Sequence, residues 1–447
     1  MADLNRLYDP FAYDTARPVP SHWMATSDAP EQGSSVPASV DTAIIGGGFT
    51  GLSAAYHLAK EHGVAACVFD AAPIGWGASG RNGGFCGFGG SKLSDAQIAR
   101  RYGADNLRRF YAVQSEAIDL VRSLLEDGID ADPQAEGEFC LAHTPRAASD
   151  FDEEAAQFKT LTGLEAPVYS KEALKQLGMH TGLAHGAMVF PKAFGLHPRK
   201  YVLGIAAKAQ AAGATLCEDT PVTSVKPDGS NGWILQTPQG QTKAKRLIIA
   251  TNGYSSEYLP DWMAGRYMPV VSHIMVTEPI SDRLRADQGW TSHQLAYDTR
   301  TLLHYFRLLP DNRMLFGMRG TSNITPRDAD TMARNVRRDF DDMFPAFKTV
   351  SASHHWNGLV CLTANLVPFV GKVAGAQNLW AGFGYHGSGV ALATWAGRHL
   401  AARVAGASTT PAPAFFGATP RKFPFPSVRR HYLPLAYKYY ALKDRLA

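Results

Sequence analysis

Residues 40–70 have the sequence VDTAIIGGGFTGLSAAYHLAKEHGVAACVFD, and this segment predicts the architecture of the chain. It opens with VDTAII, a short and mostly apolar run that predicts a buried strand. A glycine-initiated amphipathic segment follows and ends at Gly63, as a helix with a glycine cap would. The last part, VAACVFD, predicts a second buried strand. The stretch is therefore expected to form one βαβ unit of about 30 residues.

Three glycines lie where the first strand would pass into the helix. Gly46 permits a tight turn, Gly48 lets the backbone approach a pyrophosphate, and Gly51 lets helix and strand pack closely. The helix N-terminus offers unpaired N–H groups to an anion. Asp70 ends the second strand, 19 positions after Gly51, where it would accept hydrogen bonds from ribose hydroxyls. This context favours a Rossmann-like dinucleotide site over a glycine-rich turn without a ligand, but it does not decide between FAD and NAD.

Composition narrows the function classes. The 447 residues, 45% of them hydrophobic, are enough for two domains. The net charge of +4 is small and dispersed, which argues against a nucleic-acid partner. The five cysteines are widely spaced and include no CxxC pair, so neither a disulfide framework nor a zinc or other metal site is expected. With no signal peptide and no long apolar span, the sequence predicts a cytoplasmic protein without integral membrane contact.

The rest of the chain predicts two interleaved domains. Residues 94–128 and 151–180 have helical periodicity, whereas SHIMVTEPI, RTLLHYFRLL and NRMLFGMRG predict antiparallel strands, the last two joined by a turn at 310–312. The expected fold class is α/β, with a Rossmann-like domain and a discontinuous α+β substrate domain built on an antiparallel sheet. The expected segments are an N-terminal surface arm (1–38), the cofactor domain (39–93, 195–265 and 355–406), the substrate domain (94–194 and 266–354) and a C-terminal tail (407–447).

The tail ends in the basic aromatic stretch VRRHYLPLAYKYYALKDRLA, residues 428–447. Its spacing predicts an amphipathic helix docked on the body of the protein. Docking on a partner or on a membrane surface is the less favoured alternative. The oligomeric state does not follow from the sequence.

A second glycine-rich loop, PIGWGASGRNGGF at 73–85, has backbone amides that can wrap an anion and a fixed charge at Arg81. Taken alone, it would also suit a flexible surface loop. Four other motifs accompany it in order: GGGFTGLSAAYHLA (46–59), GLHP (195–198), ATNGY (250–254) and AGFGYHGSGVALATWAGRHLA (381–401). Together they resemble the amine and amino-acid oxidase family that includes D-amino-acid oxidase, glycine oxidase and sarcosine oxidase. The resemblance is greatest to the gamma-glutamylputrescine oxidase-like members.

This resemblance implies that the dinucleotide is FAD. Its adenine end would lie at the first glycine loop and Asp70, and its flavin ring near residues 78–84. The turn at 382–389 would aim the N-terminus of the next helix at the flavin pyrimidine ring, where free amides stabilise the charge of the reduced flavin. The residues expected around FAD are Gly46, Gly48, Phe49, Thr50, Gly51, Asp70, Ala78, Ser79, Gly80, Arg81, Asn82, Gly83, Gly84, Val222, Thr251, Asn252, Gly253, Cys361, Gly384, Tyr385, His386, Gly387, Ser388, Gly389 and Val390.

Three positions depart from the family pattern or carry alternatives. His386 and Ser388 are exchanged relative to the usual order, so His386 either faces the substrate as a catalytic group, together with Arg81, or donates to a nearby carbonyl. Ala391 stands where sarcosine oxidases carry a lysine for the substrate carboxylate, which favours an amine substrate. Cys361 matches the position of a covalent flavin link in sarcosine oxidases, but non-covalent FAD beside a buried thiol is the favoured alternative.

Candidates for substrate binding come from the interrupting domain. They are Tyr305, Arg307, Arg319 and Trp356, with His354 and His355 beside them. Arg307 and Arg319 lie on adjacent predicted strands and would hold a carboxylate. The competing interpretation is a pair of ordinary half-exposed strands with paired arginines.

The resemblance implies oxidation of a primary or secondary amine. Hydride would pass from the α carbon to the flavin, the imine would hydrolyse to an aldehyde, and O2 would be reduced to H2O2. The partners would be a small-molecule amine and O2. Two alternatives stay open: an amino-acid oxidase or dehydrogenase that passes electrons to a quinone, and a flavin-binding protein without catalysis.

Overall fold

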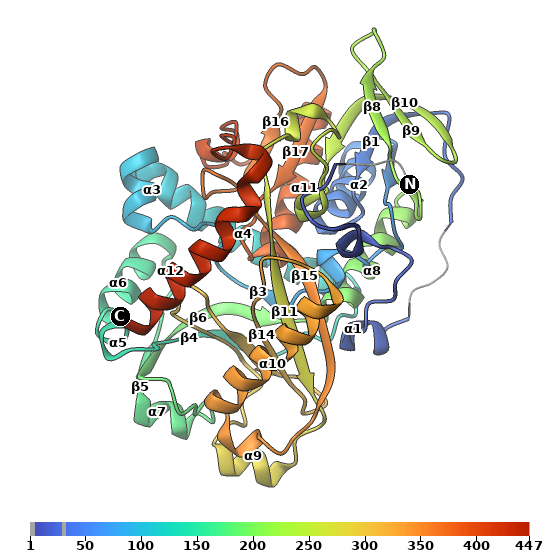
Figure 1. The fold of residues 1–447 in the computed structure, drawn as a ribbon. Helices are drawn as coiled ribbons and strands as arrows, with labels where there is room; N and C mark the ends of the chain where they lie inside the picture. The colour runs from blue at the N-terminus through green and yellow to red at the C-terminus, as the bar shows by residue number, and fades with distance from the viewer. Residues whose placement is uncertain (1–4, 29–32, 447) are drawn as a thin grey trace.

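In the computed structural model, residues 5–28 and 33–446 are described, and they fold around two β-sheets (Figure 1). The first sheet has the order β16-β17-β10-β1-β2-β7, with β8 and β9 attached through β10. Strands β17, β10, β1, β2 and β7 pair in parallel. The bounds are β1 Ser39–Ile45, β2 Ala66–Phe69, β7 Thr215–Cys217, β8 Ser224–Pro227, β9 Trp233–Thr237, β10 Gly240–Ile249, β16 Phe369–Lys372 and β17 Leu379–Phe383.

Helix α2 (Phe49–His62) joins β1 to β2 and completes the expected βαβ unit. It packs against α8 (Pro198–Ala211) and α11 (Gly389–Ala405), so its apolar face is covered from both sides. Ile44, Leu52 and Val68 lie in the resulting apolar core and are almost completely buried. This packing holds the glycine-rich turn between β1 and α2 in a fixed position, because both elements belong to a close-packed core.

The second sheet has the order β15-β11-β14-β13-β12-β4-β6-β3, with β5 paired to β6. Its pairs are antiparallel except for β12 and β4, which are parallel. The two sheets confirm the predicted fold class of a Rossmann-like domain with a separate, largely antiparallel one. The bounds are β3 Phe85–Cys86, β4 Glu136–Leu141, β5 Val168–Ser170, β6 Gly186–Gly195, β11 Met268–Thr277, β12 Leu295–Asp298, β13 Tyr305–Leu308, β14 Met314–Arg319 and β15 Ala352–Leu362.

The expected boundaries between the domains stay predictions, and β15 runs across the one placed between residues 354 and 355. The helices expected over 94–128 are α3 and α4. The segment 151–180 is not helical throughout, because β5 interrupts it by pairing with β6. The remaining helices are α1 His22–Ala25, α3 Asp95–Tyr102, α4 Ala104–Glu126, α5 Pro145–Ser149, α6 Phe151–Thr162, α7 Lys171–Gln176, α9 Asp282–Gln288, α10 Pro326–Met343 and α12 Leu433–Leu446.

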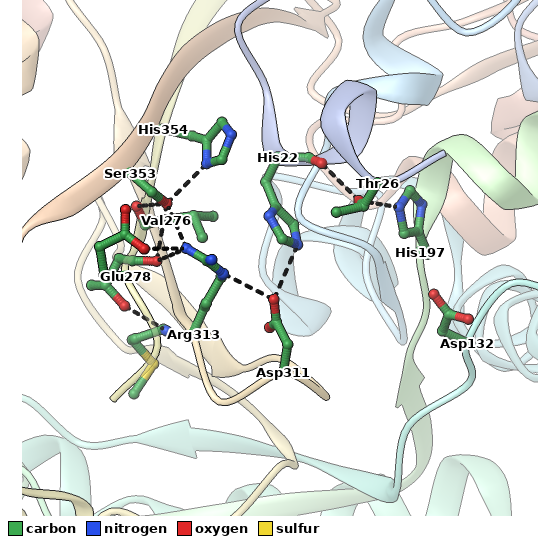
Figure 2. Close-up of polar contacts among 12 residues, drawn as sticks. His22, Thr26, Asp132, His197, Val276, Glu278, Asp311, Arg313, Ser353 and His354 are labelled. Carbon is green, nitrogen blue, oxygen red and sulfur yellow. Dashed lines mark hydrogen bonds and ion pairs between the residues drawn. The ribbon is translucent and has the colours of Figure 1, made fainter. Parts of the chain in front are cut away.

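The N-terminal arm is more deeply packed than the sequence suggests. Trp23 is 2% exposed, and its indole Nε1 donates to the carbonyl of Asn82 at 2.8 Å. A polar cluster anchors the same segment (Figure 2): Thr26 Oγ1 lies 3.0 Å from His197 Nε2, and His22 Nε2 lies 4.0 Å from an oxygen of Asp311. This segment of the arm therefore packs closely on the body, with Trp23 beside the second glycine loop. The bounds 1–38 stay a prediction, and residues 1–4 and 29–32 lie outside the described part of the chain.

The C-terminal tail docks on the body, as its periodicity predicts. Arg429 is fully buried, donates to the carbonyl of Tyr267 at 2.9 Å and forms an ion pair with Glu257. Farther along α12, the Asp444 carboxylate accepts hydrogen bonds from the backbone N–H groups of residues 301 and 302 at 2.9 and 3.0 Å. Among the described helices, none has the length and apolar character needed to cross a membrane.

Candidate active site

A cavity of about 440 Å³ opens between the two sheets. The first glycine loop, the second glycine loop, the turn before α11 and strands of the second sheet all contribute to its lining. Such a volume lies in the range of small-molecule and cofactor sites.

The first glycine loop packs so closely against neighbouring backbone that larger residues would clash at two of its positions. Gly46 has φ +108°, and a Cβ there would come within 2.7 Å of the carbonyl oxygen of Ala250. A Cβ at Gly51 would lie 1.9 Å from the carbonyl oxygen of Gly46. Asp70 accepts hydrogen bonds from the N–H groups of Gly47 at 2.6 Å and of Ala72 at 3.0 Å. Burial raises the pKa of this carboxyl to about 6.

The second glycine loop packs onto the start of α2. Ser79 Oγ accepts a hydrogen bond from the N–H of Phe49 at 3.0 Å and so caps the helix. Farther along, the carbonyl oxygen of Gly75 lies within 1.9 Å of where a Cβ on Gly80 would be, and that of Leu196 within 2.0 Å of one on Gly84. These positions need glycine because the loop lies against the backbone.

Arg81 projects from this loop into the cavity and is 7% exposed. Its Nε donates to the carbonyl of Trp76 at 2.5 Å, its Nη1 donates to that of Asn357 at 3.3 Å, and its guanidinium lies 4.0 Å from the Trp76 ring centroid. Its Nη2 has no partner among the described residues, and burial lowers the pKa of the guanidinium. A buried unpaired donor of this kind calls for an acceptor on a ligand.

The turn before α11 forms another wall. Tyr385 Oη lies 2.7 Å from Thr50 Oγ1, which ties the turn to α2. His386 has φ +54°, and its N–H donates to the carbonyl of Cys361 at 3.2 Å. Ser388, at the N-cap of α11, makes no side-chain cap hydrogen bond, so the first amides of this 17-residue helix are free for a ligand.

The imidazole of His386 is a neutral hydrogen-bond acceptor. Burial and then the nearby Lys92 ammonium lower its pKa to about 3. Its Nε2 lies 3.4 Å from Thr363 Oγ1, whose own proton goes to the carbonyl of Val367 at 2.7 Å. Nε2 therefore carries the proton, and Nδ1, which has no partner in the described part of the chain, is left as an acceptor.

Two glycine cradles, a free helix N-terminus and the unpaired Nη2 of Arg81 fit FAD. The first loop and Asp70 would hold the pyrophosphate and the adenosine ribose. Arg81 and the amides of the turn before α11 would hold the polar edge of the flavin ring. Cys361 also lines the cavity, but burial raises the pKa of its thiol to about 12, so it is not a thiolate.

Two cations face the cavity without a counter-ion. The ammonium of Lys92 and the guanidinium of Arg319 both belong to the lining, and neither forms a hydrogen bond or an ion pair with the described residues. Lys92 is solvent-accessible through the cavity, yet surrounding protein and then Arg319 lower its pKa to about 8. The sequence interpretation includes Arg319 but misses Lys92, which lies two residues after the glycine-rich segment 83–90 and has no motif of its own.

The substrate candidates separate into two groups. Tyr305 lines the cavity, and its Oη lies 2.9 Å from Ser272 Oγ. Arg307 does not line it: Arg307 donates to the side chain of Gln134 and, at 2.7 Å, to the carbonyl of Leu196. Arg307 pairs in register with residue 315, and Arg319 lies four positions farther along β14, so the structure does not bring the two guanidinium groups together in the cavity lining. Their joint binding of a carboxylate stays a prediction.

The other aromatic and imidazole candidates also lie outside the lining. Trp356 supports the site from behind, since its Nε1 donates to the carbonyl of Arg81 at 2.8 Å. The Nδ1 atom of His354 lies 2.9 Å from Ser353 Oγ, in the group of polar contacts drawn in Figure 2. The ring centroid of His355 lies 5.7 Å from that of His273.

Most residues expected around FAD line the cavity. Gly51, Gly80, Gly84, Gly253 and Gly384 lie behind it, where they allow close backbone packing. The lining set is Gly46, Gly48, Phe49, Thr50, Asp70, Ala78, Ser79, Arg81, Asn82, Gly83, Val222, Thr251, Asn252, Cys361, Tyr385, His386, Gly387, Ser388, Gly389 and Val390.

Comparison with known proteins is consistent with this geometry. A family model described as FAD dependent oxidoreductase matches residues 41–403. The chain is 30% identical to gamma-glutamylputrescine oxidoreductase of Escherichia coli (strain K12) over 412 residues, which cover 91% of this chain and 93% of that protein. It is 25% identical to sarcosine oxidase subunit beta of Arthrobacter sp over 387 residues, covering 82% and 87%. Its fold is similar to that of glycine oxidase from Geobacillus kaustophilus, with a TM-score of 0.71 and 22% identity over 86% of this chain and 99% of that one.

Proposed function

Because this chain belongs to the FAD-dependent oxidoreductase family, whose members act on amine or amino-acid C–N bonds, we propose that its substrate is a primary or secondary amine that also carries a carboxylate. Gamma-glutamylputrescine is the leading candidate, since a relative of nearly equal length is named for it. We further propose that the imine product is hydrolysed to an aldehyde and that O2 is the electron acceptor, giving H2O2.

The observation that carries this proposal is the pair of uncompensated cations, Lys92 and Arg319. Arg319 lowers the pKa of Lys92, so the two cations repel each other across the cavity, and a ligand carboxylate bound between them would offset that repulsion. Because Arg319 lies beside Gly387, within 3.4 Å of where a Cβ on that glycine would be, the pair also adjoins the turn before α11. A substrate anchored there would extend into the same chamber that the flavin-binding loops line.

The chain's own part in the reaction is to bind and orient. FAD, when bound, accepts a hydride from the carbon next to the amine nitrogen. Lys92 and Arg319 would hold the distant carboxylate of the substrate. They would thereby select substrates whose reacting carbon lies at the matching distance from that carboxylate. Tyr305 and the ring of Phe85, 5.5 Å from it, would cover the site and exclude water.

The proposal is tested by supplying gamma-glutamylputrescine to the purified holoenzyme in air and measuring peroxide. Peroxide formation in step with substrate loss supports an oxidase. Reduction of an added quinone without peroxide would instead support a dehydrogenase. D-amino acid dehydrogenase of Vibrio atlanticus (strain LGP32) is a relative with a name of that kind.

A further inference from the structure

Glu138 is a buried carboxylate that faces the cavity without a partner. It lies on β4, in the interior of the second sheet, between β6 and β12. The residue is 6% exposed, lines the cavity and has no hydrogen bond or ion pair among the described residues. Its Oε2 lies over Gly87, so closely that a Cβ on that glycine would come within 2.5 Å. Glycine at 87 therefore leaves the carboxylate open to the chamber.

This carboxylate has no evident structural task. Acidic side chains are rarely buried unless they are paired, because the charged form loses its hydration. Asp70, the other acidic residue in the described lining, is engaged by two backbone N–H groups near the first glycine loop. Glu138 is thus the only carboxylate of that lining available to a ligand in the rest of the cavity.

Resting on the proposed function, we propose that Glu138 binds the amino group of the substrate that is to be oxidised and accepts its proton. Free amines are ammonium ions at neutral pH, with pKa values near 10.4 for a lysine-like amine. Hydride can leave only from the neutral amine, since an ammonium has no lone pair to form the imine. A carboxylate in the chamber both attracts the cation and receives the proton that must be lost.

The N–H bond of the ammonium breaks, an O–H bond forms on Glu138, and the substrate is left as the neutral amine. No electron moves in this step. The later loss of hydride from the α carbon yields the protonated imine, and Glu138 returns its proton to water when the product leaves.

The surroundings of Glu138 suit a proton acceptor. Burial raises the pKa of Glu138 to about 8, and no cation counters that effect. The charge of Glu138 acts on the thiols of Cys86 on β3 and Cys140 on β4 and on the phenol of Tyr297 on β12. Burial raises the pKa of all three, so they stay neutral. A glutamate with a raised pKa holds a proton taken from an amine better than an ordinary glutamate does. It accepts that proton only in its ionised form, so the rate of substrate oxidation should rise as the pH rises through about 8.

The cavity is therefore dipolar, with Lys92 and Arg319 in one part and Glu138 in another. Among the described residues, neither cation forms an ion pair with Glu138, although all three side chains line the same cavity. The matching ligand is a chain that carries a carboxylate at one end and an amine at the other.

The first test needs no substrate. The absorbance of FAD in the holoenzyme is titrated with pH in wild type, Glu138→Gln, Glu136→Gln and Lys92→Met. Glu136 is a matched control, because it lies on the same strand but forms a salt bridge with Arg122 outside the cavity. Lys92 is included because its pKa is also about 8. We expect a transition near pH 8 that persists in Glu136→Gln and Lys92→Met and is lost in Glu138→Gln.

The second test is anaerobic reduction of the flavin by gamma-glutamylputrescine as a function of pH. Glu138→Gln should lower the second-order rate constant about 100-fold and remove the ionisation near pH 8, with partial recovery in Glu138→Asp. Glu136→Gln should behave as wild type. FAD content and thermal midpoint show that each variant is folded.

The outcomes separate the two proposals. If Glu138→Gln keeps both the spectral transition and the rate of wild type, the role of Glu138 is overturned while the proposed function stands. If no amine reduces the wild-type flavin, the proposed function fails, and with it the role of Glu138 in amine oxidation, even where the spectral titration detects its ionisation.

Discussion

The hydroxyl of Ser79 accepts a hydrogen bond from the backbone N–H of Phe49 at 3.0 Å, so the second glycine loop caps the helix that the first one begins. Two motifs 30 residues apart in the sequence are thereby joined into one cradle. Because the capped helix N-terminus is also the expected pyrophosphate site, the position of Ser79 links the stability of α2 to cofactor binding.

The substitution Ser79→Ala should lower both the stability of α2 and the affinity of the protein for FAD. Loss of this hydrogen bond costs about 1 kcal/mol, so the Kd of the apoprotein for FAD should rise roughly fivefold. Fluorescence titration of apoprotein with FAD measures it. Ser170→Ala, which removes the cap of α7 away from the cavity, should lower stability similarly and leave the Kd unchanged. An equal effect of both variants on FAD binding would contradict the link.

Asp70 should give the apoprotein a distinctive pH dependence. Its pKa is about 6 in the folded protein against the ordinary 3.8, so the folded state binds more protons between these values. The free energy of unfolding contributed by Asp70 therefore falls as pH rises from about 4 to 6. Affinity for FAD should move the opposite way, since only the carboxylate accepts from two ribose hydroxyls. Urea unfolding of wild type and Asp70→Asn across this window measures the difference, and identical pH slopes would refute it.

Trp23 should contribute strongly to stability although it lies in the N-terminal arm. It is 2% exposed, and its ring lies 4.6 Å from that of His197 and 5.5 Å from the guanidinium of Arg307. Trp23→Ala should lower the free energy of unfolding by about 3–5 kcal/mol. Trp23→Phe keeps most of the packing and loses the hydrogen bond to Asn82, so it should cost about 1 kcal/mol for that bond. Chemical denaturation tests both, and a cost below about 1 kcal/mol for the alanine variant would mean that the arm is not part of the folded core.

FAD should be released completely by acid precipitation. Cys361 lines the cavity, but its thiol is 1% exposed and has a pKa of about 12, whereas the thiolate is the reactive form. Cys361→Ser should keep the wild-type FAD content. Yellow colour that stays with the precipitated wild-type protein and disappears in this variant would establish a covalent link instead.

Much of the fold and cofactor site follows from local rules in the sequence. The βαβ unit is predictable because Gly46 and Gly51 meet steric demands that only glycine satisfies. The strand turn at 310–312 is predictable for the same kind of reason, since turn residues separate two apolar runs.

The substrate side is harder to predict because its residues have no local signature. Glu138 sits in the strand segment GEFCLA, and only the pairing of β4 between β6 and β12 turns it toward the cavity. Arg307 and Arg319 both look like ligand groups in the sequence, yet the strand register separates them. The burial of Trp23 is not predictable from local sequence because Asn82, which accepts the hydrogen bond of its indole, lies 59 residues along the chain.

The most direct test of the central claim is anaerobic bleaching of the flavin absorbance by gamma-glutamylputrescine, compared with an N-acylputrescine that lacks the carboxylate. We expect rapid, complete bleaching by the first compound and much weaker apparent binding of the second, with the difference lost in Arg319→Met. A yellow protein that neither compound nor any other amine bleaches would contradict it.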